Sequence, residues 1–223
     1  MKKLLLLDLD GTLIDTPHYE AWCYAARQIG IENLSYEEYA VWIAGRPRLE
    51  GASSLIGLKK SLVRVDSRYS DTCSVLAEIK QLEFLRLSTD IRFFDDALRL
   101  LARVETSRQD VKFYTASQNA ADLFHTALRR SGKSLSRRAV ARQRRGQTRA
   151  DLFLHLTAQY ALDAVTLVDD APHAVDAACG LGIRAYQIRR HERQPTANDS
   201  RARILPSLDD ITVPIRETPK DRQ

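Results

Sequence analysis

An apolar run near the start of the chain constrains its fold more than any other feature. Residues 4–7 are four consecutive leucines, and the sequence then continues Asp8, Leu9, Asp10, Gly11. A short apolar run that stops at a turn signal is typical of a strand buried on both faces of a parallel sheet. Open sheets of this kind bind ligands at the carboxyl ends of their strands. The sequence therefore places Asp8 and Asp10 where chemistry is expected.

The spacing of these two acids predicts a metal site. Side chains alternate along an extended strand, so Asp8 and Asp10 are expected to point to one side and Leu9 to the other. Two neighbouring carboxylates repel each other, and a divalent cation is the usual way to offset that repulsion. Gly11 then allows the chain to turn sharply away.

Composition bounds the class of protein. With 223 residues, 44% of them hydrophobic, the chain suits one large domain or a domain with an insert. No apolar stretch approaches the ~18 residues of a membrane span, and Asp8 interrupts the first apolar run too early for a signal peptide. Cys23, Cys73 and Cys179 are too scattered for a disulfide framework or a zinc site. We therefore expect a cytoplasmic protein that does not bind a membrane.

The hydrophobic periodicity changes near residue 90. Before it, the pattern predicts only helices, at 17–30, 35–45, 52–64 and 70–87, and Ser35 with Glu38 forms a capping-box pattern. After it, helices and strands alternate. The predicted helices are 90–105, 118–132, 150–162 and 171–182, and the predicted strands are 111–117, 137–143, 164–170 and 183–190.

This alternation predicts an α/β fold, a Rossmann-like parallel sheet with helices on both faces. The core comprises residues 1–15 and 91–213, and it is interrupted by a helical block at 16–90. Both ends of that block must then lie close together. Residues 214–223 are expected to form a flexible polar tail.

Two further strand ends carry polar side chains that suit phosphoryl transfer, which needs a nucleophile, a metal and hydrogen-bond donors. The strand at 111–117 ends in Thr115, whose hydroxyl can donate to a phosphate together with nearby backbone N–H groups such as that of Ala116. The strand at 164–170 ends in Asp169 and Asp170, whose carboxylates suit a hard cation.

These segments resemble motifs of the haloacid dehalogenase (HAD) superfamily, whose members are mostly phosphoryl-transfer enzymes. DLDGTLID at 8–15 resembles motif I, Thr115 after VKFY resembles motif II, and VDDAPHAVDAACGLGI at 168–183 resembles motif IV. The resemblance implies a HAD core with a C1-type helical cap inserted after motif I. It implies that Asp8 is the nucleophile and Asp10 the general acid/base. It also implies Mg²⁺ as cofactor, with the ligands Asp8, Asp10, Asp169 and Asp170, and phosphate contacts from Gly11, Thr115 and Ala116.

Motif III departs from the family pattern, which has a lysine shortly before motif IV. In the matching string, residues 147–153, Gln147 stands at the lysine position. A neutral amide cannot offset the repulsion between Asp8 and an incoming phosphate. Arg149 is the residue that we expect to replace the missing charge, with Arg145 as an alternative. The departure is also compatible with a family member that has weak activity or none.

Two other groups of basic residues bear on the substrate. Arg46 and Arg48 lie in a Gly/Pro-containing stretch between predicted helices, and we expect them to be exposed and to contact the substrate or, equally, solvent. The stretch 129–149 contains nine Lys or Arg residues and no acid. We interpret it as a positive approach to an anionic substrate. Nucleic acid is the alternative partner, disfavoured because the stretch has no aromatic residue for base stacking.

Together these features predict a Mg²⁺-dependent phosphomonoesterase that acts on a small phosphorylated metabolite through an aspartyl-phosphate on Asp8. One alternative is a phosphomutase-like phosphotransferase, because DTPHYEAW after motif I is similar to sugar phosphomutases with comparable caps. The other is a nucleotide- or nucleic-acid-linked phosphatase, or a binding module with a weakened site.

Overall fold

The chain divides into two compact units. The computed structural model describes residues 2–59, 69–107, 109–132, 139–144 and 146–214. The first unit comprises Met1–Asp15, Ile91–Arg190 and Thr196–Gln223, and the second comprises Thr16–Asp90 and His191–Pro195. The sequence-based boundaries placed 191–195 in the core. The structure groups this segment with the second unit, where the His191 ring stacks on Tyr36 at a centroid distance of 4.0 Å. Of the predicted tail, residues 215–223 lie outside the described residues.

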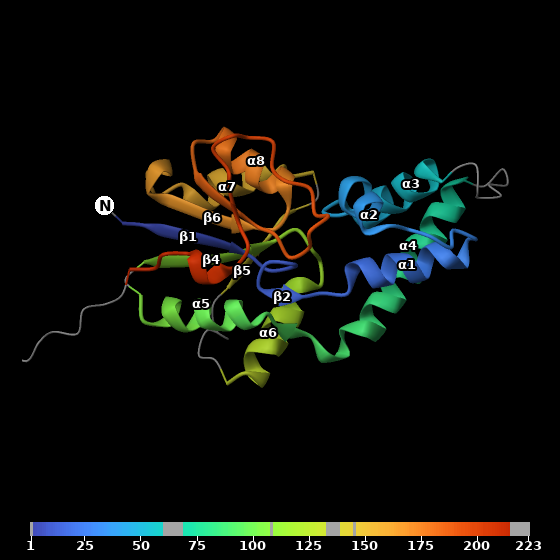
Figure 1. Cartoon of the computed structure of the whole chain (residues 1–223), viewed down its shortest axis with the longest axis horizontal. Helices are drawn as coiled ribbons and strands as arrows, with labels where there is room; N and C mark the ends of the chain where they lie inside the picture. The colour runs from blue at the N-terminus through green and yellow to red at the C-terminus, as the bar shows by residue number, and fades with distance from the viewer. Residues whose placement is uncertain (1, 60–68, 108, 133–138, 145, 215–223) are drawn as a thin grey trace, which may run out of the picture. The chain divides into compact units, whose positions relative to one another are not determined.

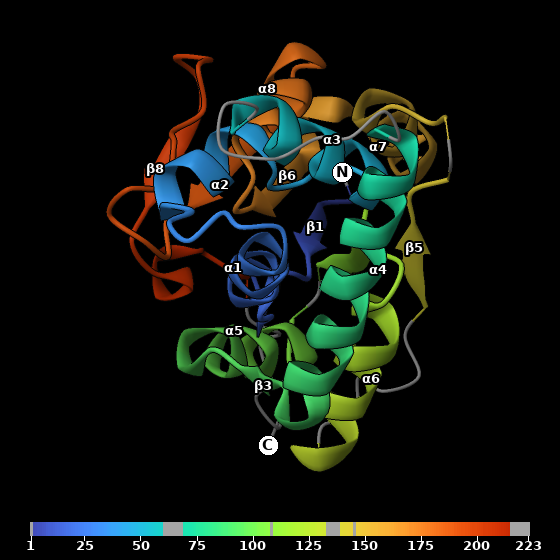
Figure 2. The ribbon, with the colours of Figure 1, turned by 90° about the vertical axis from the view of Figure 1, so that its right-hand side faces the viewer.

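A parallel sheet forms the centre of the first unit, as the sequence predicts. Within the described residues it has six strands in the order β5-β4-β1-β6-β7-β8, and every neighbouring pair is parallel. The strands are β1 (Leu4–Asp8), β4 (Asp110–Thr115), β5 (Val140–Arg142), β6 (Val165–Asp169), β7 (Arg184–Ile188) and β8 (Arg203–Leu205). Strand β1 is therefore central, and Figure 2 shows β5 and β6 on opposite sides of it. The edge strand β8 was not predicted, because three residues, of which Arg203 and Ile204 are exposed, carry no periodic signal.

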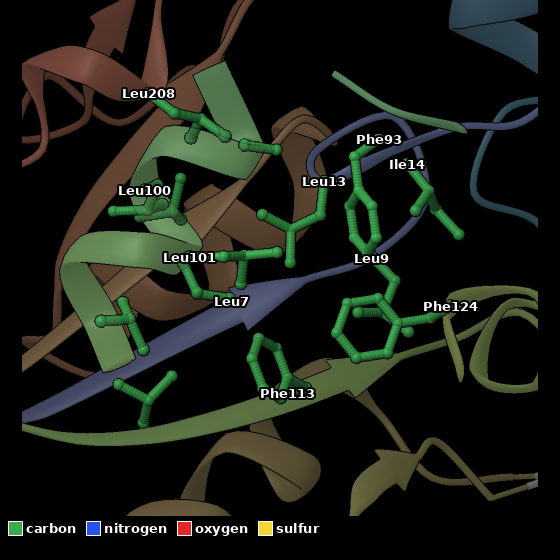
Figure 3. Packing of buried hydrophobic residues seen from close by; sticks show 14 of the residues in the cluster. Leu7, Leu9, Leu13, Ile14, Phe93, Leu100, Leu101, Phe113, Phe124 and Leu208 are labelled. Carbon is green, nitrogen blue, oxygen red and sulfur yellow. The ribbon is translucent and has the colours of Figure 1, made fainter. Parts of the chain in front are cut away.

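Helices cover both faces of this sheet. Their bounds are α5 (Asp95–Glu105), α6 (Ala120–Arg130), α7 (Arg149–Thr157) and α8 (Pro172–Gly180). Leu5, Leu7 and Leu9 share one hydrophobic cluster with residues of α5 and α6, whereas Leu4 and Leu6 share another with residues of α7 and α8. Figure 1 shows the two pairs of helices on opposite sides of β1, and Figure 3 shows the packing around Leu7 and Leu9. The leucine run is thus buried on both faces, and its side chains alternate as a strand requires.

A two-stranded antiparallel sheet joins the two places where the chain leaves and re-enters the first unit. Strand β2 (Ile14–Asp15) pairs with β3 (Arg92–Phe93), and Asp15 lies opposite Arg92. The ends of the helical block therefore lie together, as an insertion into a core requires. Neither strand was predicted, and the helix expected from residue 90 begins at Asp95 instead.

The described part of the second unit is helical. Its α-helices are α1 (His18–Gln28), α2 (Tyr36–Trp42), α3 (Arg48–Leu58) and α4 (Tyr69–Leu87), and the short 3₁₀ helix η1 (Ser88–Asp90) follows α4. The predicted capping box is confirmed, since the Ser35 hydroxyl accepts from the Glu38 N–H and the Glu38 carboxylate accepts from the Ser35 N–H. Helix α3 begins at Arg48, before the predicted residue 52, and Pro47 is its N-cap residue, whose carbonyl oxygen accepts from the Gly51 N–H at 2.9 Å. None of the described helices combines the length and apolar character that crossing a bilayer requires.

Candidate active site

Three strand ends bring the predicted site residues of the first unit together. Strand β1 ends at Asp8, with β4 on one side and β6 on the other. Its neighbours end at Thr115 and Asp169. Because parallel strands end at the same edge of a sheet, these side chains gather at one place.

A carboxylate cluster lies at this edge. One oxygen from each of Asp8, Asp169 and Asp170 lies within 4.8 Å of the others. Asp8 and Asp169 are buried, with exposed fractions of 5% and 0%. Three convergent carboxylates are the donor set that a hard divalent cation such as Mg²⁺ prefers, so these residues fit the metal that the sequence motifs imply.

Asp10 is hydrogen-bonded to the end of β4. Its Oδ2 accepts a hydrogen bond from the Thr115 hydroxyl at 3.2 Å, and the same hydroxyl accepts from the Ser117 N–H at 2.9 Å. Thr115 therefore links the end of β4 to Asp10. The described group of three acids does not contain Asp10, so its predicted role as a side-chain metal ligand stays a prediction.

The cluster carries an electrostatic cost in the absence of a cation. Burial, with the charges of Asp169 and Asp170 nearby, raises the pKa of Asp8 well above its ordinary value. Burial and the charge of Asp169 likewise raise the pKa of Asp170. A divalent cation would favour the ionised form of all these groups and so remove this cost.

Gly11 allows the turn that follows β1 to lie close to Asp170, which follows β6. Its φ angle is +68°, a conformation that other residues rarely adopt. A Cβ atom at this position would lie 2.5 Å from Oδ2 of Asp170. The predicted turn is therefore confirmed, and the structure adds a second requirement for glycine that the sequence did not reveal.

Arg190 anchors the same turn. Its guanidinium donates to the carbonyl oxygens of Gly11 at 3.3 Å and Thr12 at 2.6 Å. It also forms a largely buried ion pair with Asp96 at 2.7 Å. The sequence did not reveal this role of Arg190, since an arginine just after a strand gives no local signal of a partner far along the chain.

Tyr114 is another residue whose role the sequence did not reveal. Its hydroxyl is fully buried and donates to Oδ2 of Asp169 at 2.5 Å. The other carboxylate oxygen of Asp169, Oδ1, accepts from the Ala171 N–H at 2.8 Å. The available signal was a tyrosine within an apolar strand, because a buried tyrosine hydroxyl usually has a hydrogen-bond partner.

Arg149 lies within electrostatic reach of the cluster. Its positive charge lowers the pKa of Asp8 and of Asp170, against the larger effect of burial. It is the first residue of α7, and the described part of the chain gives its buried Nη1 no hydrogen-bond acceptor. Gln147, at the expected lysine position, instead closes a local turn, and its Oε1 accepts from the Arg144 N–H at 3.0 Å. The alternative, Arg145, lies outside the described residues.

The other residues expected to contact the substrate are divided between the two units. Arg46 is exposed, as predicted, but Arg48 is half-buried in the first turn of α3 and does not belong to a loop. Both belong to the second unit, and their contact with a substrate stays a prediction. Within the stretch 129–149, Arg142 pairs with Asp122 at 2.9 Å, whereas residues 133–138 lie outside the described ranges. Ala116, at the carboxyl end of β4, is exposed.

Replacing Gly11 by alanine tests the close approach to Asp170. Gly132→Ala is the matched control, because Gly132 has a φ of +66° and open space where the added methyl group would lie. We expect Gly132→Ala to lower the free energy of unfolding by about 1–2 kcal/mol, the cost of the left-handed backbone alone. Gly11→Ala should lower it further and weaken Mg²⁺ binding, because the methyl group displaces the Asp170 carboxylate. Equal effects of the two substitutions in urea denaturation and calorimetry would contradict this account.

The raised pKa values predict how stability depends on pH without metal. An aspartate of the unfolded chain titrates near pH 3.9, whereas Asp8 and Asp170 keep their protons to higher pH in the folded protein. The folded state then binds more protons than the unfolded state, so the free energy of unfolding falls as pH rises through this window. Urea denaturation in EDTA should show the fall, and Asp170→Asn should reduce its slope.

The acids whose pKa is lowered act in a different pH range. Asp96 and Asp199 contribute stability that is lost as pH falls, and their contribution is complete above about pH 5. The difference in slope above pH 5 between wild type and Asp170→Asn therefore reports the cluster. A stability that rises between pH 5 and 8, equally in wild type and Asp170→Asn, would contradict the prediction.

Comparison with known proteins identifies the fold. No protein-family model and no curated protein matches the sequence. Among solved structures, the β-phosphoglucomutase of the hyperthermophilic archaeon Pyrococcus sp. strain ST 04 has a TM-score of 0.68 at 22% identity, over 94% of this chain and 95% of that one. A predicted phosphoglycolate phosphatase from Haemophilus somnus 129PT has a TM-score of 0.70 at 12% identity, over 94% and 96% of the two chains.

A third similar structure carries the superfamily's name. A HAD family hydrolase from Deinococcus radiodurans R1, solved with bound phosphate and sodium, has a TM-score of 0.64 at 16% identity, over 93% of this chain and 92% of that one. At these identities the likeness shows the fold, which is the fold that the sequence motifs predicted. The chain therefore has the α/β fold of the haloacid dehalogenase superfamily.

Proposed function

We propose that the protein is a Mg²⁺-dependent phosphatase that hydrolyses a small phosphorylated metabolite through an aspartyl-phosphate on Asp8. The observation that carries the proposal is the cluster of Asp8, Asp169 and Asp170 at the ends of β1 and β6, in which Asp8 and Asp169 are buried. Its location matches the ligand-binding edge of open α/β sheets. Solved structures with this fold include proteins named as a phosphatase and as phosphomutases, which supports a phosphoryl-transfer role.

Asp8 and Asp10 divide the chemistry between them. A carboxylate oxygen of Asp8 attacks the phosphorus atom, and the bond between phosphorus and the ester oxygen breaks as the new bond forms. Asp10 gives its proton to the departing oxygen, and it then takes a proton from the water that attacks the aspartyl-phosphate. Inorganic phosphate leaves and Asp8 is regenerated. The hydrogen bond from Thr115 holds Asp10 in position for both proton transfers.

Positive charge is required because Asp8 and the phosphate repel each other. Mg²⁺ held by Asp8, Asp169 and Asp170 would supply part of this charge. Arg149 supplies the remainder in this proposal, since it already acts electrostatically on Asp8 and its guanidinium can bind phosphate oxygens in a bidentate manner.

A phosphomutase is the second candidate. Two solved structures with this fold, from Pyrococcus sp. strain ST 04 and Clostridium difficile, are named as β-phosphoglucomutases. In such a reaction the phosphoryl group on Asp8 passes to a second hydroxyl of the sugar, and water is excluded. Product analysis with a hexose phosphate distinguishes the two, because only hydrolysis releases inorganic phosphate.

The proposed function predicts Mg²⁺-dependent release of phosphate that requires Asp8. A panel of phosphorylated sugars, acids and nucleotides should contain at least one substrate for the wild type, and EDTA should abolish its turnover. Asp8→Asn should be inactive on the same substrate, because an amide cannot form the aspartyl-phosphate. If wild type and Asp8→Asn are equally inert across the panel, with no transfer between sugar positions either, the protein is not a phosphoryl-transfer enzyme.

The proposed role of Arg149 predicts a loss of rate on its removal. Losing one charge contact in the transition state typically costs about 100-fold in rate, so Arg149→Ala should lower kcat by about that factor. Arg144→Ala is the matched control, because Arg144 is exposed and its hydrogen bond to Gln147 comes from its backbone. Gln147→Lys in the Arg149→Ala protein should restore part of kcat. Full activity of Arg149→Ala would show that Arg149 does not replace the missing lysine.

A further inference from the structure

The hydroxyl of Tyr114 is a buried polar group that the proposed mechanism does not use. Tyr114 lies in β4 opposite Asp8 of β1, and its ring packs edge-on against Phe153 of α7 at a centroid distance of 5.3 Å. The ring is fully buried, so its position is fixed by the core. The hydroxyl therefore reaches Asp169 from a rigid support.

Asp169 is fixed from two directions. Tyr114, on β4, donates to Oδ2 at 2.5 Å, and the backbone N–H of Ala171, just before α8, donates to Oδ1 at 2.8 Å. The bond from Tyr114 is short, as expected for a hydroxyl that donates to a carboxylate. Because the two donors come from different elements, the Asp169 carboxylate cannot rotate without losing one of them.

The orientation of a carboxylate influences which cation it suits. Mg²⁺ requires nearly octahedral coordination by six oxygens and usually takes one oxygen from each carboxylate. Ca²⁺ accepts six to eight oxygens, and it often takes both oxygens of one carboxylate. A carboxylate that cannot turn both oxygens toward the cation therefore favours Mg²⁺.

We propose that Tyr114 is a positioning residue that holds Asp169 as a one-oxygen ligand and so makes the cluster of Asp8, Asp169 and Asp170 select Mg²⁺ over Ca²⁺. The inference rests on the metal site of the proposed function. It goes beyond that function, because it assigns metal selectivity to a residue that touches neither substrate nor metal. The hydroxyl acts through Asp169 alone.

Tyr114→Phe tests the inference directly, because it removes the hydroxyl and keeps the ring that packs on Phe153. Titration calorimetry with MgCl₂ and with CaCl₂ gives the dissociation constant of each cation for each protein. Removing a group that orients a metal ligand typically costs about 10- to 100-fold in metal affinity. We expect the Mg²⁺ dissociation constant to rise by such a factor and that of Ca²⁺ to stay the same, so that the preference for Mg²⁺ falls.

Tyr160→Phe is the matched control. It also removes a tyrosine hydroxyl that donates to an aspartate, since Tyr160 donates to Asp110 at 2.8 Å. Asp110 is the first residue of β4, at the end of the strand opposite Thr115. Both dissociation constants should therefore be unchanged in Tyr160→Phe. Equal weakening of Mg²⁺ and Ca²⁺ binding by Tyr114→Phe would indicate a merely structural role and would overturn the inference, as would no change in either.

A second pair of variants covers the case in which Tyr114→Phe does not fold because the Asp169 carboxylate loses one of its two donors. Asp169→Ala removes that carboxylate, and the double variant Asp169→Ala/Tyr114→Phe adds the loss of the hydroxyl. If Tyr114 acts through Asp169, both proteins should have the same preference between Mg²⁺ and Ca²⁺. A further loss of preference in the double variant would overturn the inference.

The outcome is separable from that of the phosphatase proposal. A changed preference in Tyr114→Phe, in a protein that turns over no phosphate ester, would support the selectivity role and remove the enzymatic one. An unchanged preference in a protein that does hydrolyse a phosphate ester would support the enzymatic role and remove the selectivity role. A wild type that binds neither cation would overturn the selectivity inference.

Discussion

The mutual repulsion of Asp8, Asp169 and Asp170 is the constraint on which the rest of the first unit depends. Asp8 ends β1, and Asp169 ends the neighbouring β6 directly before Asp170. Asp8 and Asp169 are buried, so water screens their charges poorly. Groups from separate elements offset the repulsion. Tyr114 and the Ala171 N–H donate to Asp169, and Arg149 brings a positive charge from the start of α7. The sheet holds these elements at fixed spacing, so the fold provides the arrangement and the side chains provide the charge.

The positive charge of Arg149 does not fully offset the repulsion among the acids. Even with Arg149 present, the pKa of Asp8 and of Asp170 stays raised, so the acids as they stand favour protons. Protons and divalent cations therefore compete for the same oxygens. In the proposed metal site, the surrounding groups would hold these oxygens in place for a cation. Gly11 and Arg190 contribute to that arrangement, because they fix the turn that lies against Asp170.

The sequence predicted the sheet and the acids because each is encoded locally. A leucine run before Asp8 and an apolar run before Asp169 both indicate buried strands, and the acids follow directly. Contacts across the fold could not be predicted in the same way. Tyr114 and Asp169 are 55 residues apart, and Arg190 and Gly11 are 179 apart, so no pattern within one segment links them. The short strands β2, β3 and β8 could not be predicted for another reason, since two or three residues show no periodicity.

The pairing of Asp15 with Arg92 has a consequence for how such a protein can change. The sheet of β2 and β3 belongs to the first unit, and it fixes the two ends of the inserted chain beside each other. The first unit can therefore keep its structure whatever the length or shape of the insert. In the same way, a loop tolerates extension when its ends are fixed. Evolution could exchange the insert as a module and leave the cluster of acids in the first unit intact. The segment His191–Pro195 limits this freedom, because it packs with the second unit, where His191 stacks on Tyr36. A replacement insert would have to provide a similar contact for it.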